Sequence, residues 1–332
     1  MGEKRYTLVV IHRGPEYERD FADIAEIIAT IAPDIDCYKG AFDTLVRLPP
    51  DAWERPALVV ALNPTFKLAV PRGAVLKSRQ IPKLGQLDVA RAAGIATPPA
   101  MPFRPGMKLD PILFGEFVVT KPMSVHLTSR SDGIQLFRRR RLEAMIPADF
   151  PRDHPALIDP RGCIVQRYID CGTYPSYIRV VMFAGEPIYA ATGYLDVPRP
   201  PLTSPDAVIE QAVIAIQGAG TRKRQWGAEA DAYVMARNVA EAFADVPLLA
   251  VDLMREEKSG KLYFLECNPG GNTWLFSSNQ PGQVKMRLML GDAHINDEKS
   301  ALELARRRMI DHNDAFNMAA KGLVSKTRAL AT

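Results

Sequence analysis

The sequence has few cysteines, and their spacing predicts neither a disulfide framework nor a zinc site. The four are Cys37, Cys163, Cys171 and Cys267. They form no CxxC pair and no spacing typical of structural zinc ligands. We therefore expect reduced cysteines in a cytoplasmic protein.

Long hydrophobic runs are also missing. Although 47% of the 332 residues are hydrophobic, no run approaches the ~20 residues that span a bilayer. The opening MGEKRYTLVVIHRG has a charged start but only a short apolar run and no small-residue cleavage site, so we expect a first strand there. Tyr6 stands where a myristoylation motif needs Ser or Thr. We expect no membrane partner.

Neither sign of charge is in large excess. The sequence has 42 Lys and Arg against 38 Asp and Glu, a net charge of +4, which favours anionic ligands but is far from a nucleic-acid signature. The densest clusters are Arg138–Arg141, expected at a strand end or helix start, and Arg222–Arg224. We expect no nucleic-acid partner. The five histidines are scattered and carry no nucleophile motif.

The length predicts two or three packed units of α/β (α+β) class. Tyr6–Ile11, a helix with one apolar stripe over Phe21–Ile31, and the runs IDCYKGAF and PALVVALN together predict a small open α/β sheet. We expect an N-terminal domain over 1–76, a small lobe over 77–160, a large lobe over 161–323 and a frayed tail over 324–332.

Further elements follow along the chain. Lys77–Met101 is expected to form a helix closed by Gly94 and two prolines. Strands are expected over Glu116–Pro122 with DGIQLF as its partner, over Cys163–Asp170, and in a hairpin over Arg179–Leu195 that turns at AGEP. We expect Asp196–Gly227 to be a long surface excursion, and one helix to cover Glu298 to about Leu323.

The stretch Leu248–Trp274 has the most informative pattern. Two short apolar runs around REEKSG predict a β-hairpin, and each run contains one acid, Asp252 or Glu266. Asn268 shares a face with Glu266 because side chains two apart on a strand point the same way. A turn centred near Lys258 places Asp252 opposite Phe264 and diagonal to Glu266, about 7–8 Å away.

Two interpretations of these acids are open. They are either outward residues of a half-solvated hairpin or ligands of a metal ion. Two acids and an amide among Val, Leu, Phe and Cys favour the metal, because unpaired buried charge is costly. Hard oxygen ligands in small number favour Mg²⁺, which completes its shell with water and substrate phosphates. With Lys121 at a strand end and the polar SVHLTSRS after it, the pattern indicates a nucleoside triphosphate site.

These residues resemble the ATP-grasp superfamily, the carboxylate–amine ligases that include D-alanine–D-alanine ligase and the ribosomal-protein glutamate ligases. The resemblance covers roughly Lys77 to Leu290 and is most specific in LLAVDLM and LYFLECNPGG. It implies a pre-ATP-grasp α/β domain and then a two-lobed fold with the nucleotide between two β-sheets. It also implies that Asp252, Glu266 and Asn268 hold Mg²⁺, one ion or two, with Mn²⁺ as a substitute and Glu266 bridging two ions.

The resemblance implies nucleotide contacts as well. Lys83 and Lys121 match the two nucleotide-binding lysines, and Arg179 falls where the family's DIR arginine touches phosphate or the acyl intermediate, which makes Lys121 and Arg179 the expected catalytic residues. QRYID is similar to the hinge strand QEYI. The implied nucleotide-binding residues of that strand are Gln166, Arg167, Tyr168, Ile169 and Asp170, with the backbones of Tyr168 and Ile169 on the adenine.

Three departures from the family's pattern bear on ATP. Arg167 replaces the hinge acid, and the ribose-binding acid is replaced near Tyr177, with Asp170 as the stand-in. The loop after Lys121 offers only Gly133, and a glycine-poor loop exposes fewer backbone N–H groups to phosphate. Alternative donors are Ser124, Thr128, Ser129 and Arg130.

The expected function is an ATP- and Mg²⁺-dependent ligase that activates a carboxylate as an acylphosphate and passes it to an amine or related nucleophile. The alternatives are a kinase of the same fold and a nucleotide-binding module without turnover. The expected partners are a small-molecule carboxylate and a nucleophile, and a homodimer is left open. Arg222–Arg224, followed by Trp226, either closes on an anionic substrate or is a solvated loop.

Overall fold

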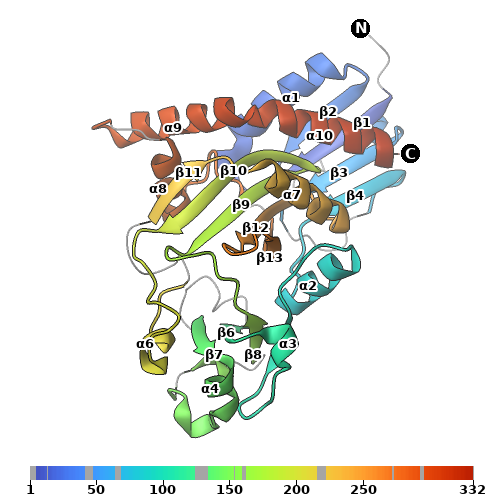
Figure 1. Ribbon diagram of the computed structural model, residues 1–332. Helices are drawn as coiled ribbons and strands as arrows, with labels where there is room; N and C mark the ends of the chain where they lie inside the picture. Colours follow the sequence, from blue (N-terminus) through green and yellow to red (C-terminus); the bar gives the residue numbers. More distant parts are fainter. Residues whose placement is uncertain are drawn as a thin grey trace.

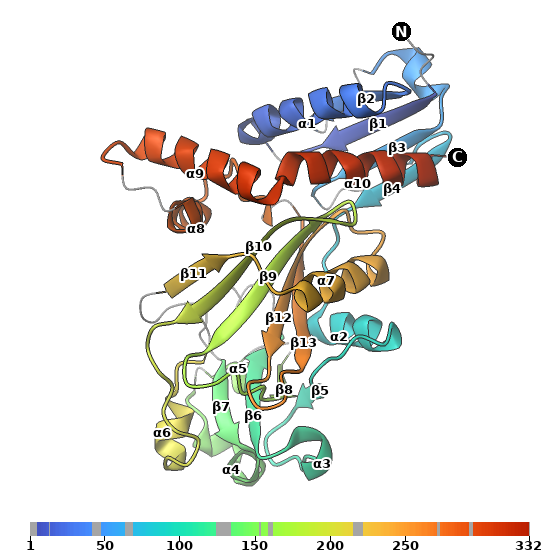
Figure 2. The ribbon, with the colours of Figure 1, turned by 45° about the horizontal axis from the view of Figure 1, so that its top comes forward.

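Three β-sheets with helices packed on them form the protein. The computed structural model describes residues 5–12, 14–41, 48–63, 69–123, 134–152, 154–158, 162–214, 222–270, 273–291 and 295–331. In these ranges the strand orders are β2-β1-β3-β4, β5-β8-β6-β7 and β11-β10-β9-β12-β13. Figure 2 shows the third sheet between the first, near both termini, and the second at the opposite end. The predicted α/β class, a small N-terminal α/β unit followed by two further sheets, is confirmed.

The N-terminal sheet is parallel, and parallel neighbours cannot be joined by a tight hairpin. Its strands are β1 (Tyr6–Ile11), β2 (Ile35–Gly40), β3 (Ala57–Ala61) and β4 (Gly73–Lys77), with α1 (Glu18–Ile31) between the first two. The predicted apolar stripe is confirmed at Phe21, Ile24 and Ile28, which are buried, but Ile31 at the end of the helix is exposed. Strand β4 was not predicted, and Lys77, assigned to a helix from sequence, is its last residue.

The second sheet contains the predicted β6–β7 pair. Its strands are β5 (Ala100–Phe103), β6 (Phe117–Pro122), β7 (Gln135–Arg138) and β8 (Cys163–Arg167), and it carries α3 (Pro111–Phe114), α4 (Arg139–Ala144) and α5 (Pro155–Ile158). The arginine cluster lies at the end of β7 and the start of α4, as expected. The polar loop after Lys121, with Ser124, Thr128, Ser129, Arg130 and Gly133, lies outside the described residues.

The third sheet holds both predicted hairpins. Its strands are β9 (Ser176–Phe183), β10 (Glu186–Leu195), β11 (Arg222–Trp226), β12 (Leu248–Arg255) and β13 (Leu262–Pro269). The β9–β10 turn is Ala184–Gly185, both at positive φ. The surface excursion expected over Asp196–Gly227 is corrected, because it contains α6 (Asp206–Glu210) and the edge strand β11.

The two faces of the third sheet have different surroundings. One face packs on α2 (Lys83–Ala92) and α7 (Ala230–Ala242), and its buried residues include Val180, Leu249 and Val251. On the other face, Val181, Phe183 and Leu248 pack towards the N-terminal unit. Strand alternation places Arg179 and Asp252 on this second face, further along the strands from the N-terminal unit than Val181, Phe183 and Leu248.

The C-terminal helices are α8 (Pro281–Gly291), α9 (Glu298–Asn313) and α10 (Ala315–Leu330), and the short 3₁₀ helices are Pro15–Tyr17, Pro50–Trp53 and Pro147–Asp149. The single final helix expected from sequence is two helices, because Asp314 has φ 50° and interrupts the helical geometry. Helix α10 continues through the segment expected to fray and packs on α1 (Figure 1). Among the described helices, none has the length and apolarity that crossing a bilayer requires.

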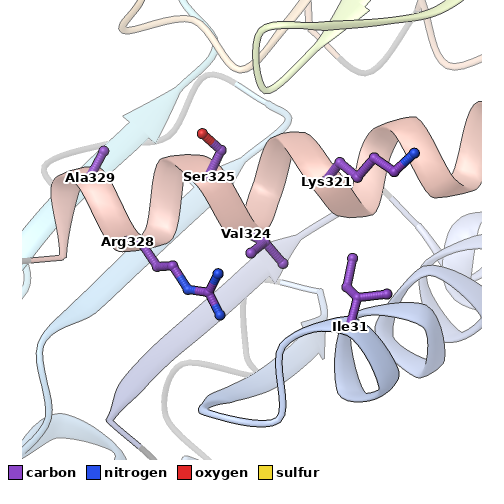
Figure 3. Close-up of a pocket in the computed structure, with 6 residues that line it drawn as sticks. All are labelled: Ile31, Lys321, Val324, Ser325, Arg328 and Ala329. Atoms are coloured by element: carbon purple, nitrogen blue, oxygen red, sulfur yellow. The ribbon is translucent and has the colours of Figure 1, made fainter.

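An open groove lies between α1 and α10 (Figure 3). Its volume is about 560 Å³, and it is lined by Ile31, Lys321, Val324, Ser325, Arg328 and Ala329. Arg328 already pairs with Asp34 at 2.7 Å. None of the six lining residues belongs to the site predicted from the sequence.

Candidate active site

The β12–β13 hairpin brings the two predicted acids closer together than the sequence indicated. Asp252 lies directly opposite Glu266, not diagonal to it, because a bulge separates that pair from the pair Leu253–Phe264. The Phe264 amide donates to Ala96 O at 2.9 Å, outside the hairpin. Directly opposite side chains share a face and lie ~5 Å apart, so the two carboxylates are neighbours.

Arg179 holds the Asp252 carboxylate in a bidentate pair. Its Nε and one terminal nitrogen each donate at 2.7 Å, from the strand next to β12. Asp252 is 6% exposed. Burial opposes the charged guanidinium, but Asp252 keeps the pKa of Arg179 above its ordinary value. Asn268 Nδ2 also donates to Asp252 Oδ2, at 3.1 Å. Two members of the predicted metal-binding trio of Asp252, Glu266 and Asn268 are therefore in contact, and strand pairing places all three on one face.

Lys83 reaches Glu266 from the first turn of α2. Its Nζ lies 2.9 Å from Glu266 Oε2. Burial would raise the pKa of Glu266, but the positive charges of Lys83, Lys121 and Arg179 outweigh it and hold that pKa below the ordinary value. Glu266 is therefore ionised at neutral pH.

Gln86, one turn after Lys83, fixes α2 against the edge strand β13. Its Oε1 accepts the Cys267 N–H at 2.7 Å, and its Nε2 donates to Ile81 O at 2.9 Å. Sequence reasoning missed this residue. The one available signal was its position three residues after Lys83, on the apolar side of the helix.

Gln86→Leu should destabilise the protein by about 1–3 kcal/mol, because two buried backbone groups lose their partner. It should also weaken nucleotide binding through displacement of Lys83. Urea unfolding and calorimetric titration with AMP-PNP measure the two effects. Asp88→Asn, on the exposed side of the same helix, is the control and should change neither. Equal behaviour of the two variants would contradict the role of Gln86.

Lys121 extends from the second sheet and is the third cation of the site. Its Nζ donates to Gln166 Oε1 at 2.7 Å, from β6 to β8. Burial, together with the nearby charge of Lys83, lowers the pKa of Lys121 to about 8, against the opposing effect of Glu266 and Asp252. The charges of Lys83, Glu266 and Asp252 therefore all act on Lys121.

This pKa predicts the pH dependence of nucleotide binding. Lys121 is protonated below pH 8 and neutral above it, and a polyphosphate favours the protonated form. The affinity for AMP-PNP should therefore fall as pH rises above 8, and binding at pH 9 should take up about one proton. Titration calorimetry in buffers of different ionisation enthalpy measures this uptake. Lys121→Met should abolish it, and a wild-type affinity that is unchanged from pH 7 to pH 9 would contradict the assignment.

The predicted hinge residues are partly engaged with other groups. The Tyr168 N–H donates to Phe117 O at 3.0 Å, so an adenine contact from this residue would use its carbonyl. Arg167 pairs with Glu256 of the β12–β13 turn at 3.0 Å and so joins the second and third sheets. Asp170 Oδ1 accepts from Arg199 at 2.6 Å, and Ile169 is buried. The hinge segment therefore lies beside the turn of the carboxylate hairpin.

The turn after Asn268 lies against the N-terminal unit. Gly270 has φ 97°, and a Cβ there would lie 2.5 Å from Ser78 Oγ and 3.1 Å from Leu62 O. Trp274 Nε1 donates to the buried Asp20 of α1 at 2.9 Å. The carboxyl ends of β3 and β4 therefore border the site, and parallel sheets bind ligands at this edge.

The donor set suits a hard cation that keeps most of its shell. In the part of the chain that the structure describes, no group of three or more His, Cys, Asp or Glu side chains could hold a metal. The trio offers two carboxylates and the amide oxygen of Asn268, whose amide nitrogen faces Asp252. Mg²⁺ needs only a few protein ligands when phosphate and water supply the rest of its coordination shell. The residues fit Mg²⁺ bound together with a polyphosphate.

A scan against protein-family models finds no match, and a search of curated proteins finds none. The chain resembles solved ATP-grasp ligases. D-cycloserine synthetase DcsG is 16% identical, with a TM-score of 0.44 over 92% of this chain and 99% of that one. D-alanine–D-alanine ligase from Bacillus anthracis is 12% identical, with a TM-score of 0.41 over 94% and 99%.

A third similar structure is the ATP-grasp ligase PsnB with minimal precursor, Mg and ADP. It is 11% identical, with a TM-score of 0.44 over 93% of this chain and 99% of that one. These proteins belong to the superfamily that the motifs resemble. At such identities and scores the likeness assigns no role to any residue here, and residue roles follow only from the contacts above.

Proposed function

We propose that this protein is an ATP- and Mg²⁺-dependent ligase. A substrate carboxylate attacks the γ-phosphorus of ATP, which forms an acylphosphate and releases ADP. An amine or related nucleophile then attacks the acyl carbon and releases phosphate. The observation that carries this proposal is the row Arg179–Asp252–Glu266 across three neighbouring strands, with Lys83 paired to Glu266 and Lys121 close by.

The charges of this cluster suit phosphoryl transfer. Lys83, Lys121 and Arg179 supply three positive charges against the two carboxylates, which leaves a net positive site for a polyphosphate. Phosphoryl transfer depends chiefly on positioning and on neutralising phosphate charge. Lys83 and Lys121 bind phosphate oxygens, and Arg179 orients Asp252 and faces the transferred group.

Asp252, Glu266 and Asn268 would hold Mg²⁺, which when bound neutralises charge on the β- and γ-phosphates. Burial raises the pKa of Asp252, and the bidentate contact with Arg179 opposes that rise and fixes the orientation of the carboxylate. Lys83 fixes the Glu266 carboxylate in the same way and helps to hold its pKa below the ordinary value. Both carboxylates are thus already oriented before a ligand arrives.

Trapping with hydroxylamine tests the reaction type. Purified protein, Mg²⁺ and ATP are incubated with pooled amino acids and small carboxylates, and ADP release and product mass are read with and without hydroxylamine. A ligase gives an acyl hydroxamate and ADP in equal amounts, because hydroxylamine attacks the acylphosphate. A stable phosphorylated product instead would establish the kinase alternative. Nucleotide binding without any ADP release across the pools would favour the module without turnover.

A further inference from the structure

The connection between β10 and β11 is far longer than its strands require. The two strands are antiparallel neighbours, with Leu195 opposite Arg222, and such neighbours can be joined by a two-residue turn. Instead the chain leaves the third sheet at Leu195, and its next strand in that sheet begins at Arg222. We call the described part of this connection, residues 196–214, the strap. Figures 1 and 2 both show its helix α6 beside β7 of the second sheet.

Arg138, the last residue of β7, binds the strap through three acceptors. One terminal nitrogen donates to an Asp206 carboxylate oxygen at 2.6 Å, and the other donates to Leu202 O at 2.7 Å and to Ser204 O at 2.8 Å. A guanidinium group donates in a fixed planar geometry, so one that meets three acceptors also fixes their positions. Arg138 therefore binds both the first turn of α6 and the backbone that leads into it.

Glu210 adds two contacts at the other end of α6. Its carboxylate accepts from Arg141 of α4 at 3.1 Å, and its backbone carbonyl oxygen accepts from Gln135 Nε2 at 3.0 Å. Gln135 is the first residue of β7 and Arg138 is the last. The strap therefore contacts β7 at both ends of the strand.

The apolar side of α6 lies on the strand that carries Lys121. Ile209 is fully buried, in one cluster with Val119 of β6 and Leu136 of β7. Val119 and Lys121 are two residues apart on β6, so their side chains share a face of the second sheet. The strap thus packs on the same face from which Lys121 extends.

The strap holds the edge of the second sheet that is remote from its chain connections. The chain enters this sheet at β5 and leaves it after β8, and these strands lie side by side at one edge of the order β5-β8-β6-β7. Strand β7 is the opposite edge, two strand spacings or ~10 Å from β8. A sheet connected along one edge can turn about that edge as a hinge. A contact at the opposite edge resists this rotation most effectively.

We propose that the strap fixes the angle between the second and third sheets, and that Arg138 is the positioning residue through which it keeps Lys121 at the phosphate site. The site takes Lys121 from the second sheet and Asp252 and Glu266 from the third. The angle between the sheets therefore decides whether these side chains meet the same polyphosphate. The effect on Lys121 rests on the proposed function, whereas the effect on the angle does not.

Distances between two spin labels test the strap without a ligand. The labels are attached at Ile112→Cys of α3, which the second sheet carries, and at Val234→Cys of α7, which packs on the third. Both positions are exposed, and the two half-buried native cysteines are replaced by serine. Without nucleotide, wild type should give one narrow distance distribution, and Arg138→Gln should broaden it. Arg140→Gln makes the same change at an exposed position of α4, and this matched control should leave the distribution narrow.

Nucleotide affinity tests the positioning of Lys121. Arg138→Gln should raise the Kd of AMP-PNP with Mg²⁺ about tenfold, because affinity falls with the fraction of molecules whose sheets are at the binding angle. AMP-PNP should in turn narrow the distance distribution of Arg138→Gln, because only that angle brings Lys121 to phosphate. Asp206→Asn should change both measurements in the same direction. It removes the ion pair from the strap and leaves the second sheet unaltered.

Equal distributions in wild type and Arg138→Gln, whether narrow or broad, would overturn the proposal, as would equal broadening by Arg140→Gln. Asp206→Asn decides the outcome if Arg138→Gln does not fold. A broadened distribution with an unchanged Kd would overturn the positioning role of Arg138. Failure of wild type to bind AMP-PNP would overturn the proposed function alone, because the distances without nucleotide still test the strap.

Discussion

Glu266→Gln should lower the rate of ADP formation by about 10²–10³-fold or more, the cost typical of removing one preorganised charge-stabilising group. Glu266 supplies one of the two carboxylates of the site and holds Lys83 at 2.9 Å. The amide removes the charge while keeping the shape, so the fold should be retained. The measurement is ADP release under saturating Mg²⁺ and ATP, with circular dichroism and thermal unfolding as folding controls.

Glu257→Gln is the matched control because it makes the same chemical change in the exposed turn of the same hairpin. It should be as active as wild type. If Glu266→Gln and Glu257→Gln release ADP at the same rate, the site has been placed wrongly. If Glu266→Gln is unfolded, the milder Glu266→Asp should still separate activity from stability.

Arg179→Gln should lower the free energy of unfolding by about 3–5 kcal/mol, because it leaves the Asp252 carboxylate buried without its cation. It should also abolish ADP formation. Urea unfolding measures the first effect. Adding Asp252→Asn to Arg179→Gln should recover much of the lost stability but none of the activity, since it removes the unpaired charge and a proposed metal ligand together.

The exposed pair Arg79–Asp245 gives the comparison for Arg179. Its side chains are 45% and 56% exposed, and exposed pairs contribute about 0–1 kcal/mol. Arg79→Gln should therefore have little effect on unfolding. Equal destabilisation by Arg79→Gln and Arg179→Gln would contradict the buried, bidentate role of Arg179.

The site was predictable where it depends on strand alternation. Asp252, Glu266 and Asn268 interrupt apolar runs at positions that one face of a hairpin must share. The bulge was not predictable, because it accompanies a hydrogen bond from Phe264 to Ala96, which is remote in sequence. For the same reason the sequence could not show that Gln86 holds α2 on β13.

The fold likewise divides into elements that local sequence patterns predict and elements that depend on pairing with remote residues. The apolar stripe of α1 and the β9–β10 hairpin come from local periodicity and were predicted. Strands β4 and β11 have five residues each and owe their conformation to pairing with β3 and β10, which no local pattern encodes. The break at Asp314 is likewise a single residue in a left-handed conformation, without the glycine that would have marked it.

The most direct test is a crystal structure with Mn²⁺ and AMP-PNP, in which anomalous scattering locates the metal. We expect a peak within ~2.2 Å of a Glu266 oxygen and of β- and γ-phosphate oxygens, with Lys83 and Lys121 in contact with phosphate. A nucleotide bound elsewhere, or a metal with no contact to Glu266 or Asp252, would contradict the account.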